Sequence, residues 1–144
     1  DALQYIANPS EQVQMAAVKS NYLALRYIQN PTLEILKAAV LQDPQAMRQI
    51  TNLDLDTVVE LLKVSTLILG YVPKQLGLTV DMVRQIITEM IANPAVEDRY
   101  VRELVSNPAI GGHQSTWPID ILSLVDAYGS IEAKKIAIDQ YLLY

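Results

Sequence analysis

A histidine, a serine and an aspartate lie close together in the last third of the sequence and are the residues best suited to hydrolysis. His113 is the only histidine of the chain, and Ser115 and Asp120 follow it. Nucleophilic catalysis needs a hydroxyl that is hydrogen-bonded to a base, and a third group that orients the base. No nucleophile elbow surrounds Ser115, so we interpret this segment as a polar surface loop.

Three acidic residues near the middle of the chain are a candidate cation site. Asp54 and Asp56 are followed by Glu60 about one helical turn later. The segment lacks the glycine turn and the regularly spaced oxygen ligands of a calcium loop. Carboxylates in the first turn of a helix are also favoured by the helix dipole. We therefore expect these acids to stabilise a helix start and to bind no metal.

The other common catalytic motifs lack their residues. The chain has no cysteine, which excludes a thiol nucleophile, a disulfide framework and a thiolate metal site. Gly111 and Gly112 are not followed by the Lys-Ser/Thr pair of a phosphate-binding loop. The sequence therefore predicts that the protein is not an enzyme and that it holds no cofactor.

A repeat near the N-terminus predicts the helices of the first half of the chain. Residues 2–18 are ALQYIANPSEQVQMAAV and residues 24–40 are ALRYIQNPTLEILKAAV, so that Ala24 corresponds to Ala2 and Val40 to Val18. A fixed period of this length is typical of stacked units that bury their apolar faces against their neighbours. The period weakens but continues, since Leu69, Tyr71 and Val72 correspond to Leu25, Tyr27 and Ile28.

Each unit is predicted to hold a short helix, an Asn-Pro corner and a longer helix. Asn8 and Asn30 are expected to cap the longer helices, because asparagine is favoured at the N-cap and proline at the next position. Asp43 is expected to cap a short helix in the same way. Beyond residue 72 we expect helices that begin at Thr79, Asn93-Pro94, Trp117-Pro118 and Ser130 and end near residues 91, 105, 127 and 143.

These signals predict an all-α fold, an α-solenoid of short and long helices. The whole chain, residues 1–144, is interpreted as a single helical-repeat domain. Residues 1–72 form the regular repeats, residues 73–106 form divergent helices, and residues 107–144 form a loop and an atypical two-helix C-terminal cap. Terminal units of such arrays commonly differ from the rest because they cover the last apolar face.

A polar position recurs within the predicted short helices and is the candidate partner-binding row. Gln4, Arg26 and Arg48 occupy it, one in each successive unit. Solenoids place equivalent residues in a row on one surface, and such rows often bind a partner; the alternative is a solvated row without a partner. The long helices give no comparable row, since Met15 corresponds to Lys37.

The charge balance favours a protein partner. The net charge is −5 and acids and bases are mixed along the chain, which disfavours contact with nucleic-acid phosphates or anionic membrane. We expect a non-enzymatic protein–protein interaction module that binds a protein or self-assembles, in the cytoplasm. The alternative is a nucleic-acid-binding repeat protein, which rests on the cations near repeat-equivalent turns, Lys19, Arg26, Lys37, Arg48 and Lys63.

Residues 1–50 resemble a family of short helical repeats of unknown function that occurs in bacteriophage and bacterial proteins. Its units have the approximate pattern A-L-x-Y-I-x-N-P-S-E-E-V-Q-x-A-A-V-K-x-N, and residues 2–21 here are ALQYIANPSEQVQMAAVKSN. The resemblance implies an α-solenoid and a phage or phage-like source, as an accessory, virion or host-directed adaptor protein. It brings no catalytic residues. From Leu53 onward the match fades.

Overall fold

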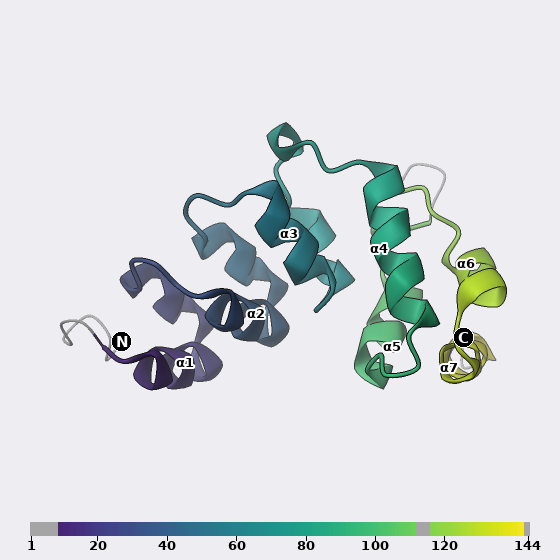
Figure 1. Ribbon diagram of the computed structural model, residues 1–144, viewed down its shortest axis with the longest axis horizontal. Helices are drawn as coiled ribbons and strands as arrows, with labels where there is room; N and C mark the ends of the chain where they lie inside the picture. The colour runs from purple at the N-terminus through teal and green to yellow at the C-terminus, as the bar shows by residue number, and fades with distance from the viewer. Residues whose placement is uncertain (1–8, 112–115, 143–144) are drawn as a thin grey trace.

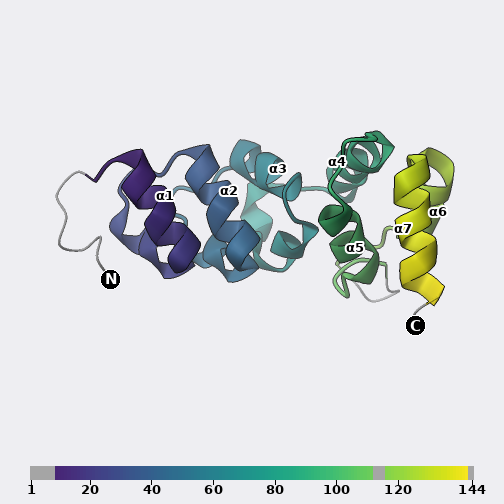
Figure 2. The ribbon, with the colours of Figure 1, turned by 90° about the horizontal axis from the view of Figure 1, so that it is seen from below.

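The computed structural model describes residues 9–111 and 116–142, and over these residues the protein is helical without a strand. The all-α class predicted from the sequence is confirmed. Figure 1 shows the helices following one another along the long axis of the molecule, from the N-terminal to the C-terminal end. Seen from below in Figure 2, they form an N-terminal group and a C-terminal group joined by a thin connection.

The N-terminal half alternates α-helices with short 3₁₀-helices. The α-helices are α1 (Glu11–Ser20), α2 (Leu33–Gln42) and α3 (Leu55–Leu62), and the 3₁₀-helices are η2 (Tyr22–Tyr27), η3 (Pro44–Gln49) and η4 (Thr66–Tyr71). Both kinds keep the spacing of the sequence repeat. Each α-helix begins at the repeat equivalent of the first residue of the preceding α-helix, and each 3₁₀-helix does the same with respect to the preceding 3₁₀-helix.

Side-chain caps recur at the same interval and fix where each helix begins. The α-helices are capped by Ser10, Thr32 and Asp54, whose oxygens accept from the backbone N–H three residues later. The 3₁₀-helices are capped by Asn21, Asp43 and Ser65, which accept from the N–H two residues later. The prediction for Asp43 is therefore confirmed.

The prediction that Asn30 caps the second long helix is wrong. Thr32, and not Asn30, caps α2, because its hydroxyl is the oxygen that reaches the N–H of Ile35, at 3.4 Å. The helix therefore starts at Leu33 and not at Pro31. Asn8 lies outside the described residues, and Ser10 caps α1 in the same manner as Thr32 caps α2.

Repeat-equivalent apolar residues form the core of this half. Neighbouring elements of the same kind contact each other, α1 with α2, α2 with α3, η2 with η3 and η3 with η4. The residues buried at matching positions are Val18, Val40 and Leu62 on the α-helices and Ala24, Ala46 and Ile68 on the 3₁₀-helices. In contrast, Val13 on α1 is 41% exposed, whereas Ile35, its equivalent on α2, is 0% exposed. The difference follows because α1 covers α2 and no described helix covers the outer face of α1.

The C-terminal half departs from the repeat spacing. It consists of η5 (Lys74–Leu76), α4 (Val80–Ala92), α5 (Asp98–Ser106), α6 (Ile121–Tyr128) and α7 (Ile131–Leu142). Thr79 caps α4, and the hydroxyl of Ser130 accepts from Ala133 at the start of α7, so both predicted starts are confirmed. Helix α5 packs on α7 and on η4, and α4 packs on α6.

Two predicted helix starts in this half are wrong. Asn93 does not begin a helix, because its side chain accepts from Ala95 N–H at 2.9 Å and closes a turn, and α5 begins only at Asp98. Trp117 does not begin a helix either, because its carbonyl accepts from Gly111 N–H at 3.0 Å. Helix α6 begins after its cap, Asp120.

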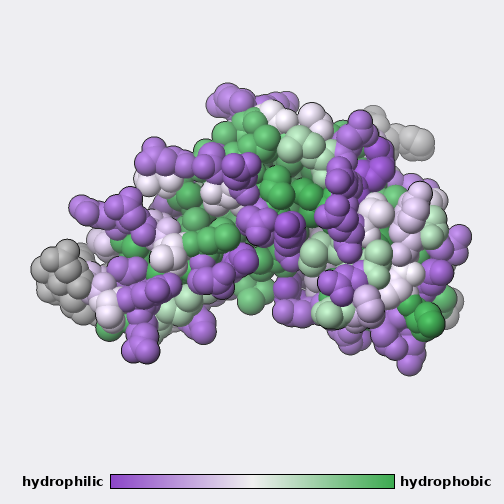
Figure 3. Space-filling view, in the orientation of Figure 1, coloured by the Kyte–Doolittle hydropathy of each residue, from purple (hydrophilic) through white to green (hydrophobic). Residues whose placement is uncertain are grey.

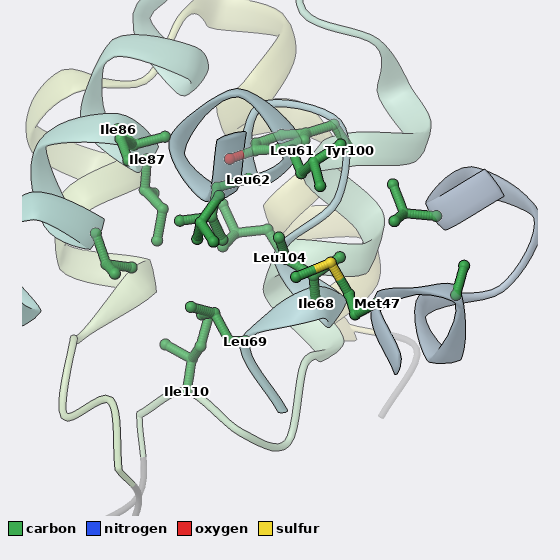
Figure 4. Close-up of a cluster of buried hydrophobic side chains, with 14 of the residues drawn as sticks. Met47, Leu61, Leu62, Ile68, Leu69, Ile86, Ile87, Tyr100, Leu104 and Ile110 are labelled. Atoms are coloured by element: carbon green, nitrogen blue, oxygen red, sulfur yellow. The ribbon is translucent and has the colours of Figure 1, made fainter. Parts of the chain in front are cut away.

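The two halves share one apolar cluster, shown in Figure 4. It brings together side chains of α3, η4, α4 and α5, together with Met47 of η3 and Ile110 of the following loop. The N-terminal repeats are therefore packed directly against the C-terminal helices, and a surface that spans both halves has a fixed geometry.

Candidate binding groove

The partner-binding row predicted on the short helices is exposed where the structure describes it. Arg26 lies on η2 and Arg48 at the equivalent place on η3, and both side chains are exposed. The guanidinium of Arg48 lies over the ring of Tyr71, 5.1 Å from its centre, which is a cation–π contact between neighbouring short helices. Arg26 has no equivalent contact partner of this kind, because the residue that corresponds to Tyr71 one unit earlier is Gln49, which has no aromatic ring. Gln4 lies outside the described residues.

A groove of about 430 Å³ lies elsewhere, between the long helices and the α4–α5 connection. One wall consists of residues from α1 and α2 and from the segment after α3: Met15, Lys19, Glu34, Lys37, Ala38, Leu41, Lys63 and Val64. The other wall consists of the end of α4, the connection and the start of α5: Met90, Asn93, Ala95, Val96, Glu97, Arg99 and Tyr100. Figure 3 shows apolar side chains at the surface in the middle of the molecule, where its lower outline is indented between the two groups of helices.

The repeat spacing builds the first wall. Lys19, Leu41 and Lys63 are repeat-equivalent residues of three successive units, and all three line the groove. Met15 and Lys37 are equivalent in the same way. The long helices repeat no single residue type at this place, but the equivalent residues of three successive units share one wall. Following the repeat onward from Lys19 would have found it.

Cations predominate among the groove residues. Lys19, Lys37, Lys63 and Arg99 line it against two carboxylates, so that four of the 11 basic but only two of the 16 acidic residues of the chain are found there. Of the cations named for the nucleic-acid alternative, the groove brings together the three lysines. Arg26 and Arg48 do not line it.

Ion pairs hold most of these cations in place. Lys37 lies 3.6 Å from Glu34, and Lys63 lies 2.8 Å from Glu60 and holds the pKa of that carboxyl below its usual value. Both pairs are partly exposed, so each contributes little to stability and exchanges readily with another carboxylate. Lys19 has no ion pair with any residue that the structure describes.

Arg99 fastens the second wall to the first. Its Nη2 donates to the backbone carbonyl of Val64 at 2.9 Å, and its Nη1 lies 2.8 Å from Glu103. Its Nε lies 3.6 Å from Glu97. The guanidinium therefore bridges α5 and the segment after α3, and joins one wall of the groove to the other.

Tyr100 closes the inner side of the groove. Its side chain is only 2% exposed and lies in the apolar cluster with Leu61 and Leu62 (Figure 4). Its hydroxyl has no hydrogen-bond partner among the described residues, and burial raises the pKa of the phenol well above its usual value. A buried hydroxyl without a partner is unfavourable, so this residue is a structural anomaly at the groove.

Of the residues considered for chemistry, Asp54, Glu60 and Asp120 make local contacts with neighbours in the sequence. His113 and Ser115 lie outside the described residues. The carboxylate of Asp120 accepts from the backbone N–H and the hydroxyl of Ser123, at 3.1 and 2.8 Å, and these bonds lower its pKa. Hydrogen bonds from the side chain of Thr57 and from its backbone N–H, the latter at 2.8 Å, lower the pKa of Asp54, while Glu60 pairs with Lys63.

A metal-binding cluster and a membrane-spanning helix are both absent from residues 9–111 and 116–142. That part of the chain contains no group of three His, Cys, Asp or Glu placed to hold a metal ion, and none of its helices has the length and apolar character that a membrane crossing requires. A second hollow, of about 650 Å³, lies between η4, the start of α4 and Pro108, Ala109, Thr116 and Trp117.

Comparison of the chain with protein-family models, with curated proteins and with solved structures finds no match.

Proposed function

We propose that this protein is a non-enzymatic protein-binding module, built as an α-solenoid whose long helices carry the binding surface. The observation that supports the proposal is the wall formed by Lys19, Leu41 and Lys63 at one place on three successive units. Stacked repeats commonly bind partners along surfaces of this kind. Leu41 is 49% exposed there and lines the groove together with Met15 and Val64, so this wall offers a partner an apolar surface as well as charge.

The resemblance of residues 1–50 to phage and bacterial helical repeats suggests a setting for this function. On that resemblance the protein is an accessory, virion or host-directed adaptor component, located in the cytoplasm or the particle.

Nucleic-acid binding is the second candidate, because the groove gathers Lys19, Lys37 and Lys63. Affinity for a phosphate backbone depends on many uncompensated cations. Here Glu34 and Glu60 pair with two of the three lysines, and the net charge is −5. We therefore place this function behind protein binding.

Affinity capture with matched variants tests the proposal. The tagged protein is incubated with lysate, with and without nuclease, beside a groove variant (Lys19→Glu with Lys63→Glu) and a control variant (Lys134→Glu with Lys135→Glu), which changes the same number of exposed charges on α7. A stoichiometric protein that survives nuclease supports the function. Recovery of nuclease-sensitive material alone, or of nothing, contradicts it.

A further inference from the structure

We propose that the groove binds an acidic segment of a partner protein that inserts at least one large apolar side chain. This inference rests on the proposed protein-binding function and adds the chemistry of the partner. It follows from the charge of the first wall, the apolar residues beside the charges, and the size of the hollow.

The wall formed by the long helices is rich in positive charge. Lys19, Lys37 and Lys63 project from it against one lining carboxylate, Glu34. Lys19 has no ion pair within the described part of the chain, and the pairs of Lys37 and Lys63 are exposed and therefore easily exchanged. An acidic segment would pair with Lys19 directly and compete for the other two lysines. Complementary charge of this kind sets the orientation and the rate of association.

Apolar side chains line the groove beside the charged ones. Leu41 is the most exposed large apolar residue of α2, and Met15, Val64, Met90 and Val96 line the groove with it. Methionine side chains adapt to the shape of an apolar ligand because they are unbranched and flexible. The groove therefore offers apolar side chains on both walls and lysines on the first wall, which matches a segment with both acidic and apolar side chains.

The size of the groove selects a segment rather than a folded domain. A volume of about 430 Å³ falls within the range of about 300–1,000 Å³ typical of ligand sites. It holds a few side chains, as in complexes where a helix or an extended peptide is laid into a groove.

A nucleic acid fits this groove less well. Single strands bind by stacking their bases on exposed aromatic rings, and the one aromatic residue of the described lining, Tyr100, is buried. The apolar side chains of the groove would also have no counterpart on a phosphate backbone.

Selection from a displayed library of random short peptides tests the inference. Peptides selected on the intact protein are synthesised with a fluorescent label, and their dissociation constants are measured by anisotropy at low and at physiological salt. We expect selected sequences to be rich in Asp and Glu and to contain Leu, Ile, Met or an aromatic residue. The groove variant, and separately Leu41→Asp, should weaken binding by about tenfold or more, and the α7 control variant should leave it within about twofold.

Several results would overturn the inference. These are no enriched peptides, enriched peptides without acidic residues, and an affinity that the groove variants leave unchanged while circular dichroism shows them folded. Labelled single- and double-stranded oligonucleotides are measured in parallel, and tighter binding of these that the groove variant abolishes would assign the groove to nucleic acid. If lysate capture recovers a partner that the groove variant retains, this inference fails while the protein-binding function stands. If capture recovers no protein at all, the function itself fails.

Discussion

The side-chain amide of Asn107 donates to the backbone carbonyl of Thr66, 3.1 Å away, and joins the end of α5 to the start of η4 across 41 residues of sequence. The same nitrogen lies 3.3 Å from the Thr66 hydroxyl, and both residues are buried. The Asn107 oxygen accepts from Ala109 N–H at 2.9 Å, so one amide closes a local turn and a long-range contact. With the bond from Arg99 to Val64, it holds the second wall of the groove against the repeats.

Replacing Asn107 with alanine is expected to lower the free energy of unfolding by about 2 kcal/mol, because the buried carbonyl of Thr66 loses its donor. Urea unfolding followed by circular dichroism measures the change. Asn93→Ala is the matched control, since Asn93 closes the same kind of turn with Ala95 N–H but is exposed. Equal losses in the two variants would show that the contact with Thr66 contributes nothing.

Replacing Arg99 with methionine should lower the free energy of unfolding by about 1 kcal/mol, because the bond to the Val64 carbonyl is lost at a partly exposed site. The change should also weaken any peptide bound in the groove, since the second wall is no longer fastened to the first. Arg102→Met, at an exposed position of the same helix, is the control. Binding that is equally strong in both variants would contradict the fastening role.

Replacing Tyr100 with phenylalanine should leave the free energy of unfolding unchanged or raise it by up to about 1 kcal/mol, because the hydroxyl that is removed has no partner in the described part of the chain. A clear loss of stability would show that the hydroxyl is bonded in solution. Chemical unfolding at neutral pH measures the difference, with Tyr128→Phe, at an exposed tyrosine, as the control.

The same residue predicts a loss of stability in alkali. Burial raises the pKa of Tyr100, so the folded protein keeps the phenol proton when the unfolded chain begins to lose it near pH 10.0, the usual pKa of tyrosine. Above that pH the unfolded state binds fewer protons, and the free energy of unfolding falls as pH rises. Tyr100→Phe should flatten this decline and Tyr128→Phe should not. Parallel curves for the wild type and Tyr100→Phe would refute the assignment.

Replacing Gly129 with alanine should lower the free energy of unfolding by about 1–3 kcal/mol, because a Cβ there would lie 2.6 Å from the carbonyl oxygen of Val125. The next residue, Ser130, donates from its N–H to the carbonyl of Ile91 at 2.8 Å, so a shift of Gly129 also disturbs this hydrogen bond between the residue before α7 and α4. Gly70→Ala is the control, since a Cβ there meets nothing within 4 Å, and it should change stability by less than about 0.5 kcal/mol. Equal effects on the thermal unfolding midpoint would argue against the steric account.

Elements that depend on local chemistry could be predicted from the sequence. The starts at Asp43, Thr79 and Ser130 are confirmed because each residue caps its helix through a neighbour two or three positions away. Asn93-Pro94 misled because an asparagine side chain can close a turn as well as cap a helix, and the sequence does not distinguish the two outcomes. The prediction for Asn30 is wrong because Thr32, which follows Pro31, is also a favoured N-cap residue and is the one that caps α2.

The groove could be predicted only in part. The wall that contains Lys19, Leu41 and Lys63 follows from the sequence repeat and the direction in which side chains leave a helix. The opposite wall comes from residues 90–100, outside the regular repeats, and its position depends on Arg99 and on the apolar cluster shared by both halves. Such contacts between distant segments leave no periodic signal.

The equal spacing of the caps has a genetic consequence. Deleting residues 33–54 would join Thr32 directly to Leu55 and leave Thr57 three places after a capping hydroxyl, as it is now after Asp54. In-frame recombination between copies can therefore remove or add a whole unit while every helix keeps a start signal. A duplication would add one more side chain to the row of Lys19, Leu41 and Lys63, so the row can lengthen by one residue for each unit gained.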